Sequence, residues 1–346
     1  MKIVIFFLFI FIHSLSVAHV IDLNNSKIDN SLHAYLPHYV NRKHVADKPV
    51  VLNTLYQPVQ EELRFIFIVP SYNNAVWYEK NLHSIFSQKY SNYHVIYVDD
   101  ASTDGTAELV ENFVKQNKYE DKFTLIKNKQ RRGMAYNRLI ANRLCQPTDI
   151  CMAIDGDDWF PHNDVLSLYN KIYHDRNVWM TYGQFVSYPS GREGFCKELP
   201  GDVIAQNAFR SVCWTTTHLK TYYAWLYRLV DEECFKKHGI FLRAATDYAM
   251  MYPMLEMAGI HSKFVPEITY VYNQANPLAL LNQKKTKQKM SQAKSFVLSQ
   301  RRYKPIRIDL KQNLSNEIMV RHCRTAPHSV VIKKIKKQQW SGLRAR

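Results

Sequence analysis

Three aspartates within four positions are the residues of this 346-residue chain best suited to chemistry. Asp155, Asp157 and Asp158 directly follow the apolar run 150–154. Carboxylates this close repel one another unless a cation or hydrogen-bond donors face them. Their oxygens suit Mg²⁺ or Mn²⁺, which keep water ligands and borrow others from a substrate phosphate. The cluster therefore indicates a metal ion bridging protein and diphosphate. A surface turn, which Asp and Gly also favour, is the alternative.

These aspartates must be positioned by the elements around them. In the first half of the chain, short apolar runs typical of buried strands alternate with segments that carry apolar residues on one helical face. Alternation of this kind predicts an α/β fold, a doubly wound and mostly parallel sheet with helices on both faces. Ligands of such sheets bind beyond the carboxyl ends of the strands. Short apolar runs predict strands at 64–70, 93–98, 123–126 and 150–154, and one-sided apolar faces predict helices at 77–88, 106–115 and 134–144. Further along, the patterns predict strands at 178–188 and 264–272, helices at 222–238 and 247–258, and a loop region at 189–213.

Polar residues follow the first two predicted strands. The first strand ends in the segment 70–74, PSYNN, and the second ends in Asp99 and Asp100. A carboxylate at a strand end can accept a hydrogen bond from a base imide or a ribose hydroxyl. No GxGxxG follows the first strand, which argues against a pyrophosphate cradled on a helix N-terminus. A metal ion would then have to meet the phosphate charge.

The segments VPSYNN, VDDASTDGT and IDGDDW, in this order, resemble the catalytic domain of glycosyltransferase family 2, which has the GT-A fold. The resemblance covers about residues 63–273. It implies transfer of a sugar from a nucleotide-diphosphate donor to an acceptor hydroxyl with inversion, assisted by Mg²⁺ or Mn²⁺. We expect a UDP-sugar as donor. A glycan, a lipid and a protein all stay open as the acceptor.

The resemblance also implies roles for the residues on the donor side. Pro70 and Tyr72 are expected to line the nucleotide pocket. Asp100 is expected to contact the base, with Asp99 beside it at the donor site. Asp155 is expected near the ribose or the metal ion.

The remaining roles concern the metal ion, the diphosphate and the base. The resemblance implies Asp157 as the principal metal ligand and Asp158 as the alternative. Arg132 and Asn137 match the family's segment near the donor diphosphate, although an exposed arginine is usually just solvated. Asp247, before a predicted helix, matches the catalytic base, and a purely structural N-cap is the alternative.

The basic charge of the chain is concentrated in a C-terminal tail. Residues 276–346 hold 18 of the 46 lysines and arginines but only two of the 30 acids, which leaves 28 of each in the rest of the chain. Such a tail suits an anionic membrane surface or an acidic acceptor, and a solvated tail without a partner is the alternative. We do not expect it to bind nucleic acid.

The N-terminus predicts export. Lys2 precedes the apolar run 3–12, and the segment 16–18, SVA, supplies a small-x-small cleavage site. We interpret residues 1–18 as a signal peptide to the secretory lumen, the periplasm or the exterior, with an uncleaved membrane anchor as the alternative. An irregular arm at 19–62, a catalytic domain at 63–275 and the basic tail complete the predicted organisation.

Two other functions compete with sugar transfer. A nucleotidyltransferase would be expected to carry a glycine-rich, basic loop after the first strand, where this chain has SYNNA at 71–75. A non-catalytic exported sugar-binding protein on the same fold is the second rival. The presence of the motif carboxylates together with Asp247 argues against such a loss of activity.

Overall fold

The computed structural model describes residues 61–278, 284–308 and 320–321, and all of them belong to one compact unit, Gln60–Arg346. The predicted signal peptide, almost all of the N-terminal arm and much of the basic tail lie outside these residues. Across the described ranges, no helix is both long and apolar enough to cross a membrane.

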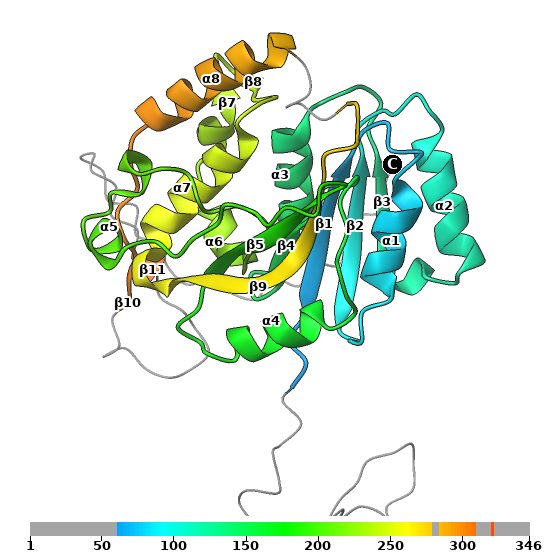
Figure 1. Cartoon of the computed structure of the whole chain (residues 1–346), viewed down its shortest axis with the longest axis horizontal. Helices are drawn as coiled ribbons and strands as arrows, with labels where there is room; N and C mark the ends of the chain where they lie inside the picture. The colour runs from blue at the N-terminus through cyan, green and yellow to red at the C-terminus, as the bar shows by residue number, and fades with distance from the viewer. Residues whose placement is uncertain (1–60, 279–283, 309–319, 322–346) are drawn as a thin grey trace, which may run out of the picture. The chain divides into compact units, whose positions relative to one another are not determined.

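A seven-stranded sheet forms the centre of the unit, with the strand order β3-β2-β1-β4-β6-β5-β9 (Figure 1). The pairs β1–β2, β1–β4, β2–β3 and β5–β9 are parallel, whereas β6 runs antiparallel to both β4 and β5. This mostly parallel sheet confirms the predicted α/β fold. The strands of the sheet are β1 (Phe65–Ser71), β2 (Tyr93–Asp99), β3 (Phe123–Lys127), β4 (Ile150–Ala153), β5 (Met180–Tyr188), β6 (Lys220–Tyr223) and β9 (Ser262–Asn273). The short pairs β7 (Lys236–Lys237) with β8 (Ile240–Phe241) and β10 (Arg307–Ile308) with β11 (Val320–Arg321) are antiparallel.

Helices pack on both faces of this sheet because the strand side chains alternate between two hydrophobic clusters. On one face, Phe65 and Phe67 of β1 pack with α1 (Tyr78–Phe86), α2 (Thr106–Gln116) and α4 (Val165–Tyr173). On the other face, Ile66 and Ile68 pack with α3 (Met134–Leu144), α6 (Ala224–Arg228) and α7 (Thr246–Ala258). Figure 1 shows α1 and α2 on the opposite side of the sheet from α3 and α7.

The structure departs from the sequence prediction around β6. The predicted helix at 222–238 is wrong: this stretch holds part of β6, the short helix α6, the 3₁₀ turn η5 (Glu232–Phe235) and β7. The predicted loop region at 189–213 contains the short helix α5 (Gly201–Ala205) and the 3₁₀ turn η4 (Phe209–Ser211). The 3₁₀ turns η3 (Glu120–Lys122) and η6 (Gly259–His261) and the sixteen-residue helix α8 (Lys284–Ser299) complete the described elements.

Buried polar contacts join α8 and the residues after it to α7. The Arg210 guanidinium donates to Glu256 Oε1 at 2.6 Å and to the carbonyl oxygen of Val297 at 2.8 Å. The backbone N–H of Tyr303 donates to Glu256 Oε2 at 2.8 Å, and that of Ile306 donates to the Met257 carbonyl at 2.9 Å. The described residues from Lys284 to Ile306 therefore pack onto the same unit as the sheet.

Candidate active site

The Asp100 carboxylate is buried and holds the loop between β3 and α3. Its Oδ1 accepts from the backbone N–H of Arg132 at 2.7 Å and from Asn128 Nδ2 at 2.9 Å, and its Oδ2 accepts from the N–H of Gly133 at 2.8 Å. Asn128 also donates to Asn137 Oδ1 at 2.8 Å. Asp100 and Asn137 thus lie in one polar cluster at the carboxyl ends of β2 and β3, which is the edge that the sequence predicted for ligands.

Asp99 lies beside this cluster with part of its carboxylate unpaired. Oδ2 accepts from the backbone N–H of Ser102 at 3.0 Å, whereas Oδ1 is buried without a hydrogen-bond partner. A buried acceptor without a partner costs free energy, which makes Oδ1 a candidate to receive an N–H or O–H group from a ligand.

The loop after β1 and the aspartate turn after β4 touch each other. The Pro70 carbonyl accepts from the N–H of Gly156 at 3.1 Å. A Cβ at Gly156 would stand only 2.8 Å from Cβ of Ser71, so only glycine permits this approach. Tyr72 lies at the surface of the same edge, with the guanidinium of Arg131 3.7 Å from the centre of its ring. Arg132 is exposed and stacks on Tyr136 at 4.4 Å.

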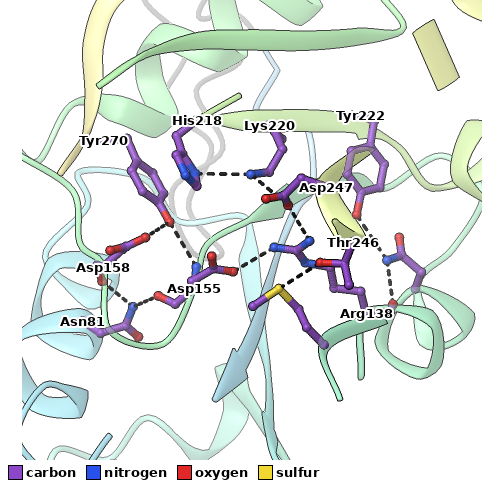
Figure 2. A network of polar contacts seen from close by, with 12 residues as sticks. Asn81, Arg138, Asp155, Asp158, His218, Lys220, Tyr222, Thr246, Asp247 and Tyr270 are labelled. Atoms are coloured by element: carbon purple, nitrogen blue, oxygen red, sulfur yellow. Dashed lines mark hydrogen bonds and ion pairs between the residues drawn. The ribbon is translucent and has the colours of Figure 1, made fainter. Parts of the chain in front are cut away.

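Asp158 is directed into the protein and not toward a ligand. It is 1% exposed, and both carboxylate oxygens are hydrogen-bonded internally. Oδ1 accepts from the backbone N–H of Asn273 at 2.7 Å, and Oδ2 accepts from the Tyr270 hydroxyl at 2.6 Å (Figure 2). Asn81 Nδ2 donates to the Asp158 carbonyl at 2.7 Å. Asp158 therefore ties the aspartate turn to β9.

Asp157 is partly exposed, and its carboxylate Oδ2 accepts one hydrogen bond, from Asn276 Nδ2 at 2.8 Å. Burial and the neighbouring charge of Asp155 raise the pKa of Asp157 to about 6. Both effects disfavour the anion, so a cation placed beside this carboxylate would stabilise it. Of the two residues expected as principal metal ligand, Asp157 is the one with an accessible side chain.

The cluster fits a metal ion only if substrate and water supply most of the ligands. In the part of the chain that the structure describes, no three His, Cys, Asp or Glu side chains are grouped so that they could hold a metal ion. Mg²⁺ commonly binds through one or two carboxylates together with waters and phosphate oxygens. Asp157 and the neighbouring Asp155 offer hard oxygen ligands of that kind.

One buried arginine joins the aspartate turn to the start of α7 (Figure 2). The side chain of Arg138, in α3, is 2% exposed. Its Nη2 donates to Asp155 Oδ1 at 2.8 Å and its Nη1 donates to Asp247 Oδ1 at 2.7 Å. Asp155, expected near the donor, and Asp247, expected as the base, are thus bound by the two terminal nitrogens of one guanidinium.

A buried lysine contacts the same oxygen of Asp247. Lys220 Nζ lies 3.3 Å from Asp247 Oδ1, and the Asp247 side chain is 31% exposed. Burial opposes ionisation of Asp247, but the charges of Lys220 and Arg138 outweigh it and hold its pKa well below the usual range. Asp247 is therefore a carboxylate at neutral pH.

Comparisons with known proteins identify the domain that holds Asp100, Arg138 and the aspartate turn. Residues 66–232 match the sequence model described as Glycosyl transferase family 2. These residues form a family 2 glycosyl transferase domain. The mostly parallel sheet with flanking helices is its GT-A fold. The family match ends before α7, so Asp247 lies outside the matched residues.

Two of the curated relatives are larger proteins that this chain matches in part. The chain is 28% identical over 125 residues to an uncharacterized glycosyltransferase of Rickettsia bellii, which is 36% of this chain and 17% of the relative. It is 26% identical over 145 residues to glycosyltransferase GlyA of Streptococcus pneumoniae serotype 4, which is 42% of this chain and 20% of the relative. The chain thus spans about a fifth or less of these relatives.

Solved structures with a similar fold are more distant. The structure of S. aureus TarS 1–349 in complex with UDP-GlcNAc is 19% identical, with a TM-score of 0.47, 61% of this chain covered and 59% of that chain. The mannosyltransferase PcManGT of Pyrobaculum calidifontis, in complex with GDP-Man and Mn²⁺, is 25% identical, with a TM-score of 0.43, 62% of this chain covered and 58% of that chain.

Sequence reasoning missed three residues beside the family 2 domain's carboxylates. Arg138 directly follows Asn137, which was predicted to lie at the donor site. A charged residue on the buried face of α3 is the sequence feature that could have identified it. Lys220 is 0% exposed and begins β6, just before a stretch that was predicted to be helical. Asn276 follows β9, and nothing in the sequence linked it to Asp157.

Proposed function

We propose that this glycosyltransferase moves a sugar from a UDP-sugar to an acceptor hydroxyl, with inversion at the anomeric carbon and with Mg²⁺ or Mn²⁺. The observation that carries the proposal is the shared guanidinium of Arg138, because it brings Asp155 and Asp247 to one edge of the sheet. A donor beside Asp155 and an acceptor beside Asp247 would then be neighbours.

The donor side offers groups that suit a nucleotide diphosphate. The buried Oδ1 of Asp99 is an acceptor of the kind that the imide N–H of uracil requires. We also propose the base contact for Asp100, whose carboxylate holds the backbone of Arg132. Pro70 and Tyr72 would form the wall of this pocket, and Asn137 would support it through Asn128.

The acceptor side offers a base. Arg138 and Lys220 both contact Oδ1 of Asp247, so we propose Oδ2 as the atom that receives the proton of the acceptor hydroxyl. The acceptor oxygen bonds to the anomeric carbon from the face opposite the diphosphate, and the bond from that carbon to the diphosphate oxygen breaks. A metal ion held by Asp157, with Asp155 close by, would supply positive charge to the departing diphosphate.

The proposal is tested by ligand binding and then by turnover. We expect UDP and UDP-sugars to raise the melting temperature with Mn²⁺ present and much less without it. GDP serves as the nucleotide control. Asp247→Asn should abolish transfer yet keep the UDP shift, whereas Asp157→Asn should lose the metal-dependent part of the shift. Asp202→Asn, an exposed site in α5, is the matched control and should behave as wild type.

Four outcomes would contradict parts of the proposal. A protein that no nucleotide stabilises is not a nucleotide-sugar transferase, and a glycan-only shift would favour the sugar-binding alternative. Retained anomeric configuration in the product, read by NMR, would refute inversion. Full turnover by Asp247→Asn would remove that residue from the role of base.

We also propose export through residues 1–18. N-terminal sequencing of the mature protein should then begin at His19, and an intact Met1 in exported protein would favour the anchor instead.

A further inference from the structure

Lys220 is a charged side chain that is fully buried, which is unusual enough to need a reason. It is 0% exposed at the start of β6. Because β6 runs antiparallel, its first residue lies at the edge where the parallel strands end, and it pairs with Ala153 at the end of β4. The register therefore places an ammonium group beside the aspartate turn and the start of α7.

His218 fixes one side of this ammonium. Lys220 Nζ lies 3.2 Å from His218 Nδ1, and the imidazole is stacked on Tyr270 with ring centres 4.4 Å apart. Burial, followed by the charge of Lys220, holds the pKa of His218 well below its usual value, so the ring is neutral. An ammonium has only donors, so Nδ1 accepts the bond and the ring proton resides on Nε2.

Asp247 fixes the other side, and its two oxygens are used unequally. Lys220 Nζ at 3.3 Å and Arg138 Nη1 at 2.7 Å both contact Oδ1. Two cations from two different elements, β6 and α3, thus converge on one carboxylate oxygen. Such an arrangement restrains the rotation of the carboxylate, and Figure 2 shows both cations converging on Asp247.

We propose that Lys220 is a positioning residue for the acceptor step: anchored by His218, it holds Oδ1 of Asp247 together with Arg138 and so leaves Oδ2 free for the proton of the acceptor hydroxyl. This inference rests on the proposed role of Asp247 as base. Lys220 differs from Arg138 in one respect that can be measured. Arg138 also contacts Asp155 on the donor side, whereas the contacts described for Lys220 are to His218 and Asp247.

The difference predicts a split between kinetic parameters. Lys220→Met keeps the length of the side chain and removes its charge. We expect kcat to fall by about 10- to 100-fold, because a displaced catalytic group loses on the order of that factor. The KM for the donor and the affinity for UDP with Mn²⁺ should stay unchanged. Arg138→Met should impair both.

The pH profile gives a readout that simple packing would not move. The charged or titratable groups that face Asp247 among the described residues are Arg138 from α3, Lys220 from β6, His218 before it, Tyr272 from β9 and the adjacent Tyr248. Since Lys220 lowers the pKa of Asp247, Lys220→Met should move the acid limb of the kcat profile to higher pH. Lys220→Arg should restore the wild-type limb in part. Lys263→Met, at an exposed position of β9, is the matched control.

The outcomes separate this inference from the proposed function. If Lys220→Met keeps the wild-type kcat and acid limb, or if it loses UDP affinity as much as turnover, Lys220 is not a positioning residue for Asp247. If Asp247→Asn turns over normally, the base assignment itself is wrong. If Lys220→Met is insoluble, His218→Phe retains the ring stack and removes the Nδ1 acceptor. That variant must then lower kcat at unchanged donor KM, and wild-type kinetics in it would overturn the inference.

Discussion

Removing the Arg210 guanidinium should cost this domain a large part of its stability. The side chain of Arg210 is 3% exposed and that of its partner Glu256 is 0% exposed. The guanidinium donates to both carboxylate oxygens, at 2.6 and 2.9 Å, and to the carbonyl oxygens of Val297 at 2.8 Å and Gln300 at 2.7 Å. Arg210→Met would leave a buried carboxylate and two carbonyls of the α8 end without these donors.

The expected cost follows from the burial of the pair. Unit charges 2.6 Å apart attract by about 6 kcal/mol at an effective dielectric constant of 20, before desolvation is subtracted. Losing one partner of a buried pair costs about 3–5 kcal/mol, because the remaining charge stays buried. A domain of this size loses about 2–4 °C of melting temperature per kcal/mol. We therefore expect a drop of about 6–20 °C in Arg210→Met.

The cost should also depend on pH. Burial raises the pKa of Glu256 despite the opposing effect of Arg210, and removing Arg210 raises it further. A carboxyl with a raised folded-state pKa destabilises the fold as pH rises from the unfolded pKa to the folded one. The drop in melting temperature caused by Arg210→Met should thus be larger at pH 8 than at pH 5.

Circular dichroism melts at both pH values test this reasoning. As a control, Arg192→Met removes an exposed arginine from the loop after β5, and it should melt close to wild type. A deficit in Arg210→Met no larger than that of the control would refute the buried-pair argument. A deficit that grows on acidification would refute the sign of the pKa argument.

Three further predictions concern the site and the tail. Asp100→Asn replaces with an N–H donor one of the two carboxylate oxygens that accept from the backbone of Arg132 and Gly133. We expect the free energy of unfolding in urea to fall by about 1–3 kcal/mol and UDP binding in calorimetry to weaken. Wild-type values in both assays would contradict this. Gly156→Ala places a Cβ 2.8 Å from Cβ of Ser71, so it should lower the free energy of unfolding by about 1–3 kcal/mol. An unchanged melting temperature would show that the backbone here can move apart without cost, and would contradict this prediction. Deleting residues 309–346, nine lysines and arginines against two acids, should abolish salt-sensitive sedimentation with anionic vesicles while α8 stays in place, and unchanged sedimentation would exclude this part of the tail.

The strands that the sequence predicts well are those that stand out as apolar runs between polar turns. β1, β2 and β4 read as continuous apolar runs between polar turns, and each begins and ends within a residue or two of its prediction. β6 was missed because it is a four-residue strand whose sequence KTYY runs directly into the apolar helix α6. No local pattern distinguishes a short antiparallel strand from the start of a helix in such a stretch.

In the site, too, the features set by neighbouring residues could be predicted from the sequence, and those set by distant strands could not. That Asp155, Asp157 and Asp158 lie at a strand end follows from the apolar run before them. Which of them is buried does not, because Asp158 is held by Tyr270 and Asn273 from β9, more than 100 residues later. Contacts of that separation depend on the register of the whole sheet.

The distribution of cations at this edge explains where a divalent ion would bind. On the proposed acceptor side, Asp247 contacts two cations, Lys220 and one terminal nitrogen of Arg138. On the proposed donor side, Asp155 contacts the other terminal nitrogen of Arg138, and the Asp157 carboxylate accepts from the neutral amide of Asn276. Negative charge is therefore in excess around Asp155 and Asp157, whereas positive charge is in slight excess around Asp247. A divalent ion is attracted to the excess of negative charge, so we expect it at Asp157. The cations around Asp247 would keep the ion away from the carboxylate that we propose as the base.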